Sequence, residues 1–201
     1  GDTYALPGVI LATVVFDYLF WSFAFLRMGT TGLVAQAWGR GDNKEQENLF
    51  WRSVLLGLGF GILIVILQKP IGWFAFKMLA GDPAMHEAGK AFYEIHIWGA
   101  IPTLISYGCI GWLLGRQRSR DMIIVSLLWQ GTNILLDYWL IIHLDMGARG
   151  AGWAVMISEW VGMFACLYFV IRNWRGIPHL RLQEVFEWQL MRPLIALNGT
   201  I

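Results

Sequence analysis

The sequence is poor in charged residues. Asp, Glu, Lys and Arg make up 14% of the 201 residues, whereas an ordinary soluble domain has about 25%. Fifteen basic residues against fourteen acidic ones leave a formal net charge of +1, so no overall field attracts nucleic acid or other polyanions. A chain of this composition lacks the charged surface that keeps a domain in solution. The composition therefore excludes a soluble enzyme, a disordered tail and a basic nucleic-acid-binding protein.

The sequence also has few of the residues that build disulfide frameworks and metal clusters. Its two cysteines, Cys109 and Cys166, both lie inside apolar stretches, which excludes a disulfide scaffold and argues against a metal cluster. None of the four histidines has a second ligand at metal-site spacing, and we interpret His96 and His143 as residues of the membrane interface. We therefore expect no metal site and no bound cofactor.

Apolar side chains, by contrast, are abundant and make up 57% of the residues. A helix that spans a bilayer needs about 20 mostly apolar residues, and five stretches meet this requirement. The short alternating segments that are typical of membrane barrels do not occur. The sequence predicts an all-α, polytopic helix bundle in one membrane domain. Its helices should lie near residues 8–38, 50–76, 92–115, 122–143 and 152–171, with the start of another at 194–201.

Basic residues are concentrated on every second connection between the predicted helices. Lys and Arg are enriched on the cytoplasmic side of membrane proteins, and ten of them fall on one set of alternate connections against four on the other. We therefore expect the chain to begin outside and to end inside, as a fragment of a longer membrane protein. The ten residues are Arg40, Lys44, Arg52, Arg116, Arg118, Arg120, Arg172, Arg175, Arg181 and Arg192, and the four are Lys69, Lys77, Lys90 and Arg149.

Four polar residues recur on one face of the predicted helix 122–143. Ser126, Gln130, Asn133 and Asp137 are spaced four, three and four residues apart, which places them on one side of a helix. A buried carboxylate one turn from a carboxamide can bind a proton or a small cation. The alternative is that these side chains only join helices through hydrogen bonds. Charges at bilayer depth are costly and therefore candidates for function, and the regular spacing of these four residues leads us to favour ion or proton binding.

The predicted helix 152–171 carries a second candidate group. Met156 and Glu159 share one face of this helix, and Ser158 lies beside them. These residues line the same cavity in our interpretation, with Met156 as part of an adaptable apolar surface for substrate. The alternative for Glu159 is a structural ion pair with Arg27.

Glycines recur at four-residue spacing in the predicted helix 50–76. Gly57 and Gly61 form a small-xxx-small pattern around Gly59, which favours close packing of helices over phosphate binding.

Four segments resemble one family of membrane transporters. Residues 29–42, GTTGLVAQAWGRGD, resemble the end of the second helix in multidrug and toxic compound extrusion (MATE) transporters, and residues 25–28, FLRM, resemble the branch named for DNA-damage-inducible protein F. Residues 147–154, GARGAGWA, resemble the entry to the sixth helix, and residues 197–201, LNGTI, the start of the seventh. The resemblance covers the whole chain.

This resemblance implies a fold of twelve helices in two six-helix lobes, of which the first helix and the C-terminal lobe are absent here. It implies an antiporter of the bacterial inner membrane that exports organic, often cationic, compounds in exchange for H⁺ or Na⁺. Asn133 and Asp137 match the Asn–Asp pair of the family's cation or proton site. Val155 stands where some members have a Thr ligand, with Ser158 one turn further on, so we expect H⁺ coupling over Na⁺.

Two other functions stay open at this point. A flippase for lipid-linked oligosaccharides, from a related two-lobed superfamily, would need an arginine-lined cavity, and the predicted interior offers Arg27. An intramembrane enzyme would need a nucleophile and a base at matching spacing, and the sequence has no such cluster. We therefore expect a transporter that works in the lipid bilayer on small organic molecules, with no nucleic acid as partner.

Overall fold

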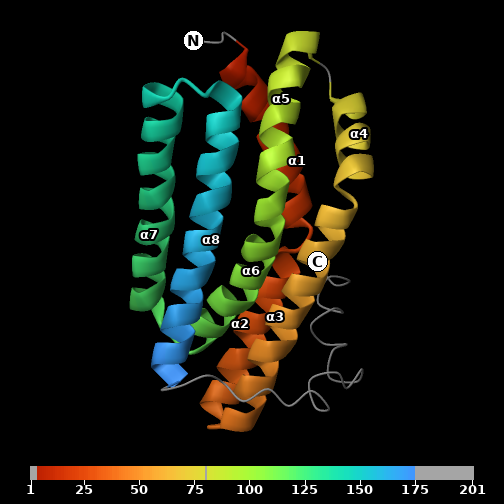
Figure 1. Cartoon of the computed structure of the whole chain (residues 1–201). Helices are drawn as coiled ribbons and strands as arrows, with labels where there is room; N and C mark the ends of the chain where they lie inside the picture. Colours follow the sequence, from red (N-terminus) through yellow and green to blue (C-terminus); the bar gives the residue numbers. More distant parts are fainter. Residues whose placement is uncertain (1–3, 80, 175–201) are drawn as a thin grey trace.

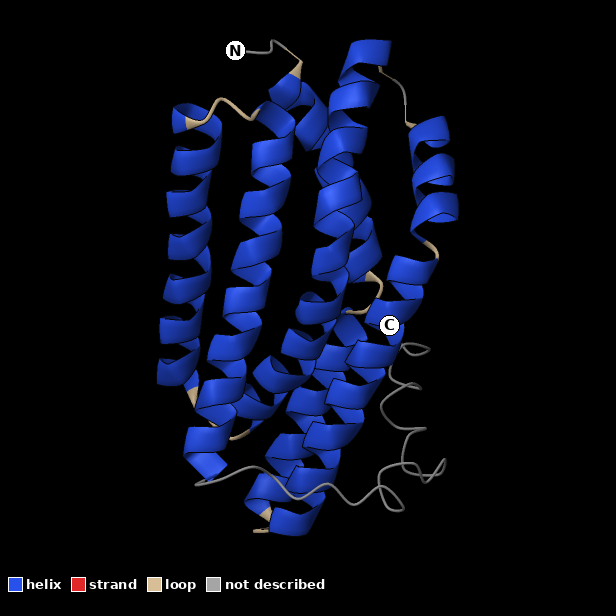
Figure 2. Ribbon diagram, in the orientation of Figure 1, coloured by secondary structure: helices blue, strands red, loops and turns tan. Residues whose placement is uncertain are grey.

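In a computed structural model of the chain, which describes residues 4–79 and 81–174, every regular element is a helix (Figure 2). The prediction of an all-α, polytopic bundle is confirmed, and the helix start predicted at 194–201 lies outside the described residues. The elements are α1 (Ala5–Trp21), α2 (Ala24–Gly39), α3 (Asn43–Ile66), α4 (Gln68–Met78), α5 (Pro83–His96), the 3₁₀ turn η1 (Ile97–Gly99), α6 (Ala100–Gly115), α7 (Ser119–Asp137), the π-helical turn η2 (Tyr138–His143) and α8 (Gly147–Trp174).

Several of these helices continue one another as long rods. By length and hydropathy, four helical stretches of the described chain qualify as membrane spans: Ala5–Gly39, Asn43–Ile66, Pro83–Gly115 and Gly147–Trp174. The predicted span 122–143 is not among them. It forms α7 and η2, and α7 lies beside α8 along its length (Figure 1). Its spanning of the membrane stays a prediction.

The predicted helix 50–76 is in fact two helices, α3 and α4, and its predicted start is wrong. Helix α3 begins earlier, at Asn43, because the Asp42 carboxylate caps it by accepting a hydrogen bond from the Glu45 N–H at 3.0 Å. The helix ends at Ile66, and α4 begins at Gln68. Pro70 lies in the first turn of α4, where its missing N–H costs no helical hydrogen bond. The same proline would break a continuous helix, which explains the interruption at Leu67.

The glycine pattern predicted close helix packing, and the contact between α3 and α6 confirms it for two of the three glycines. A Cβ added at Gly61 would lie 2.7 Å from the Ile101 Cα, and one added at Gly57 would overlap the Leu104 carbonyl. Gly59 faces away, with no atom within 4 Å of an added Cβ. Backbone meets backbone here, as in membrane helix pairs built on small residues.

At one end of the bundle, the side chain of Arg116 packs among three tryptophan rings. The Arg116 guanidinium lies 4.5 to 4.9 Å from the ring centroids of Trp38, Trp112 and Trp174. The pKa of Arg116 is below its ordinary value, first because of burial and then because of repulsion from Arg118. Cation–π contacts with the three rings offset part of the cost of burying the charge. This cluster joins α2, α6 and α8.

The basic connections gather at that same end. The α2–α3 and α6–α7 connections and the last described turns of α8 lie together at the bottom of the view in Figure 1, and the α4–α5 and η2–α8 connections lie at the top. Successive connections thus alternate between the two ends of the bundle, as the charge pattern predicted. The basic residues of this end that the structure describes are Arg40, Lys44, Arg52, Arg116, Arg118, Arg120 and Arg172. We refer to it as the basic end.

Candidate functional site

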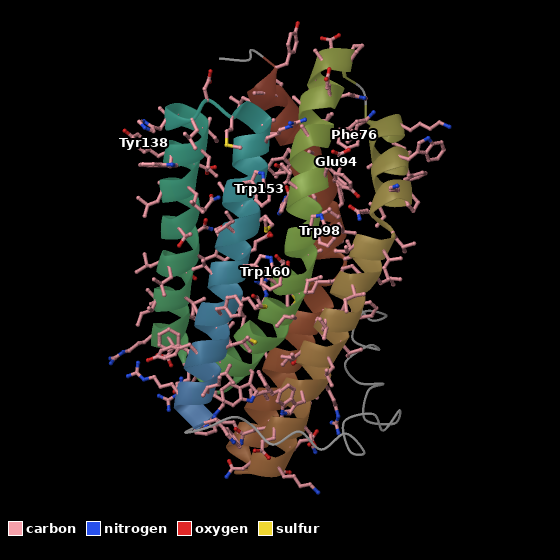
Figure 3. The ribbon with its side chains drawn as sticks, in the orientation of Figure 1. Phe76, Glu94, Trp98, Tyr138, Trp153 and Trp160 are labelled. Carbon is pink, nitrogen blue, oxygen red and sulfur yellow. The ribbon has the colours of Figure 1, made fainter. Side chains whose placement is uncertain are left out.

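The four polar residues of α7 divide into two pairs. Asn133 and Asp137 are half-buried, whereas Ser126 and Gln130 are exposed in the described chain. All four lie within the regular part of α7 and therefore share one face, as their spacing requires. The pair nearer the end opposite the basic end is the enclosed one, and Tyr138, the residue after Asp137, lies near that end in Figure 3. A role of Ser126 and Gln130 in lining a cavity stays a prediction.

The side chains of Asn133 and Asp137 are available to bind a further group. The Asn133 Nδ2 is inaccessible and has no hydrogen-bond partner among the described residues. In the same part of the chain, no Lys, Arg or His forms an ion pair with the Asp137 carboxylate. The two side chains are one helical turn apart, so a carboxylate and a carboxamide can act on the same small ion or proton.

A change of helix type directly follows Asp137. In η2 the Leu144 N–H donates to the Trp139 carbonyl, five residues back, at 3.0 Å. Such wide turns occur mostly as short interruptions of α-helices and often at functional sites. No residue in this segment predicts the π-helical turn, because its residues are ordinary apolar and aromatic helix formers.

Contacts between α7 and α8 fix the height of the site in the bundle. An added Cβ at Gly162 would meet the Trp129 ring, and one at Gly150 would lie 3.1 Å from the Leu140 carbonyl oxygen. The two antiparallel helices are therefore in a register that places Asn133 at the height of Ser158.

The candidates on α8 differ in what they offer. Ser158 is buried, and its hydroxyl donates to the Val155 carbonyl at 2.7 Å. Val155, with no side-chain oxygen, packs against the apolar core, and Met156 is half-buried. Their roles as cavity-lining residues stay predictions.

Glu159 forms a pair that the sequence did not indicate. Its Oε1 lies 2.9 Å from the His96 Nε2, and both residues are buried, with 4% and 5% of their surfaces exposed. The alternative that Glu159 pairs with Arg27 is wrong, because Arg27 is exposed and lies over the Tyr107 ring. His96 is buried between α5 and α8, and its position relative to the membrane interface stays a prediction. Sequence reasoning missed His96 as a functional candidate.

Metal ligands do not converge in the described chain. Within residues 4–79 and 81–174, no group of three or more His, Cys, Asp or Glu side chains is placed to hold a metal ion. Cys109 and Cys166 are buried free thiols.

Comparisons with known proteins agree on one family. The sequence profile described as MatE matches residues 2–139. The chain is 35% identical over 198 residues to DNA damage-inducible protein F of Escherichia coli K12, covering 98% of this chain and 43% of that protein. It is 28% identical over 175 residues to a probable multidrug resistance protein NorM of Thermotoga maritima, covering 84% and 37%. The chain thus spans less than half the length of these relatives.

The fold is also found in solved structures. A transporter of the MOP superfamily from Pyrococcus furiosus superposes with a TM-score of 0.87 at 22% identity, over 98% of this chain and 44% of the other. The helical bundle, its apolar spans and these matches define a multi-pass membrane protein of transporter type. The chain belongs to the MATE family, whose members are transporters and not enzymes.

Proposed function

We propose that the chain forms one lobe of a secondary antiporter that exports organic, often cationic, compounds in exchange for H⁺ or Na⁺. The multidrug resistance proteins among the relatives support the class of substrate. The share of each relative that the chain covers, 37% to 43%, is consistent with one lobe of two. A further helix and a second lobe of the same polypeptide would then complete the transport path.

The observation that carries this proposal is the half-buried Asn133–Asp137 pair, which has unused binding capacity. Asp137 would alternate between a protonated or cation-bound state and a free state, and each state would favour one of the two orientations of the lobes. A ligand shifts such an equilibrium only by its difference in affinity for the two states. A single ionisable group that is accessible first from one side of the membrane and then from the other meets this requirement.

A proton is the coupling ion that fits these residues better. Sodium must replace its hydration shell with several oxygens, and hard cations take oxygen ligands. Val155 contributes no side-chain oxygen, which leaves Asn133, Asp137 and Ser158 as the candidate side-chain oxygen ligands. A proton needs one carboxylate whose ionisation the surroundings can change. We therefore infer H⁺ exchange at Asp137, in a bacterial inner membrane with the basic end in the cytoplasm.

The first test is drug accumulation in cells that express the complete transporter polypeptide. We expect these cells to retain less of a fluorescent organic cation than cells with an empty vector, because export opposes entry. An uncoupler that collapses the proton gradient should abolish the difference. Equal retention in both strains, with the protein present in the membrane, would contradict the proposal. Transfer of a labelled lipid-linked oligosaccharide without export of the cation would favour the flippase.

A further inference from the structure

The buried pair of His96 on α5 and Glu159 on α8 is separate from the Asn133–Asp137 site. Each partner uses one atom in their 2.9 Å contact. The other atoms, His96 Nδ1 and Glu159 Oε2, are buried and have no hydrogen-bond partner within the described ranges. Figure 3 shows Trp98 and Trp160, the neighbours of Gly99 and Glu159, far from either end of the bundle. A charge at this depth is costly unless it is compensated or neutralised.

Aromatic rings surround the imidazole of His96. The Phe16 ring centroid lies 3.9 Å from that of His96, and those of Phe92 and Phe20 lie at 5.1 and 6.2 Å. The π-face of an aromatic ring attracts a cation, and a carboxylate at hydrogen-bond distance stabilises the protonated imidazole further. The surroundings of His96 are thus suited to hold the pair with one added proton.

Other ionisable groups lie on the helices that pack around the pair. Asp17 on α1, Arg27 on α2 and Glu159 all interact electrostatically with Tyr107 on α6. Asp17 and Arg27 are exposed and carry opposite charges. On the far side of α8, α7 contributes Asp137 and η2 contributes the exposed His143. Within the described residues, none of these four groups forms an ion pair with His96 or Glu159.

The pair is located at a break in the span Pro83–Gly115. Between α5 and α6 the helix tightens to the 3₁₀ turn η1, and Pro102 explains why, since it has no N–H to donate to the Trp98 carbonyl. The Glu159 carboxylate rests against Gly99 in this turn, where an added Cβ would overlap Oε2. A 3₁₀ stretch inside a longer helix often marks a hinge. A change of charge at the pair therefore acts directly on this break.

We propose that His96 and Glu159 form a second proton-binding site. A neutral imidazole beside a carboxylate takes up one proton from water, and the net charge of the pair changes from −1 to 0. The neutral pair is stable where it is buried beside Gly99, whereas the negative pair favours water and an opening between α5 and α8. The site lies on the opposite side of α8 from Asp137, so the two sites can load separately.

Histidine NMR tests this site without substrate or transport, so a failure of export leaves the test intact. We would label the histidines of the complete polypeptide with ¹⁵N in lipid bilayers and identify His96 as the signal lost in H96Q, or by its contact with labelled phenylalanine rings if H96Q does not fold. Followed from about pH 8 to pH 5, the His96 ¹⁵N shifts should change from those of a neutral imidazole to those of a protonated one. Glu159→Gln should lower the protonated fraction of His96 at a given pH, because the carboxylate no longer stabilises the cation.

Two further variants separate the site from its surroundings. Gly99→Ala keeps both ionisable groups but displaces the Glu159 carboxylate, so it should shift the His96 titration in the same direction as Glu159→Gln. Asp137→Asn should move the midpoint by much less than Glu159→Gln. A His96 signal that does not change over this pH range, or one that Glu159→Gln leaves in place, would overturn the proposal.

Discussion

Replacing Asp137 by Asn is expected to lower gradient-driven export by roughly 5- to 150-fold, the range that typical coupling free energies give. The substitution removes the negative charge and the ionisable proton but keeps the shape of the side chain. The Asn133 carboxamide one turn away cannot replace a carboxylate, because it neither ionises nor neutralises a cation. The measurement is the initial rate of export from vesicles that contain the complete polypeptide.

The chain offers a matched control for this substitution. Asp145 is exposed in the connection between η2 and α8 and has a φ of 51°, a conformation that Asn tolerates well. Asp145→Asn therefore makes the same change of charge near the same end of the bundle, and it should export at the wild-type rate. If Asp137→Asn also exports at that rate and keeps its dependence on the gradient, Asp137 is not the coupling group.

Gly57→Ala is expected to lower the free energy of unfolding by about 1–3 kcal/mol, the usual cost of overpacking. The new methyl group would overlap the Leu104 carbonyl oxygen and lie 2.7 Å from its carbon. Both are backbone atoms of α6, so no side chain can rotate away, and α3 and α6 must separate. Thermal unfolding of the purified protein in detergent measures the loss.

Gly59→Ala is the control on the same helix, two residues away. An added methyl group there meets no atom within 4 Å, and Ala in place of a helical Gly gains roughly 0.5–1 kcal/mol from backbone entropy. We expect its stability to equal or exceed that of the wild type. Equal stability of the two variants would show that α3 and α6 do not pack through Gly57.

The features that sequence predicted correctly depend on local chemistry. Long apolar stretches and the four-residue spacing of Gly57 and Gly61 each express a rule that acts within one helix. The shared face of Asn133 and Asp137 follows from helical periodicity in the same way. Their half-burial beside α8 is a tertiary property, but a polar stripe on an otherwise apolar helix already indicated it.

The contact that sequence missed depends on partners from other helices. The sequence predicts His96 at the membrane interface because its apolar stretch begins near Phe92. The helical rod that contains His96 begins earlier, at Pro83. His96 is therefore about 20 Å along the rod from its start, at about 1.5 Å per residue. Its contact with Glu159 depends on the small size of Gly99, which only the assembled bundle reveals.

Export from sealed vesicles under an imposed gradient tests the antiport account most directly. Vesicles with the complete polypeptide would hold a fluorescent organic cation and face either a proton gradient or, at equal pH on both sides, a Na⁺ gradient. The account predicts that a proton gradient alone drives export and that Asp137→Asn abolishes most of it. Export driven by Na⁺ at equal pH, and not by protons, would contradict proton coupling, and export driven by neither ion would contradict the antiporter.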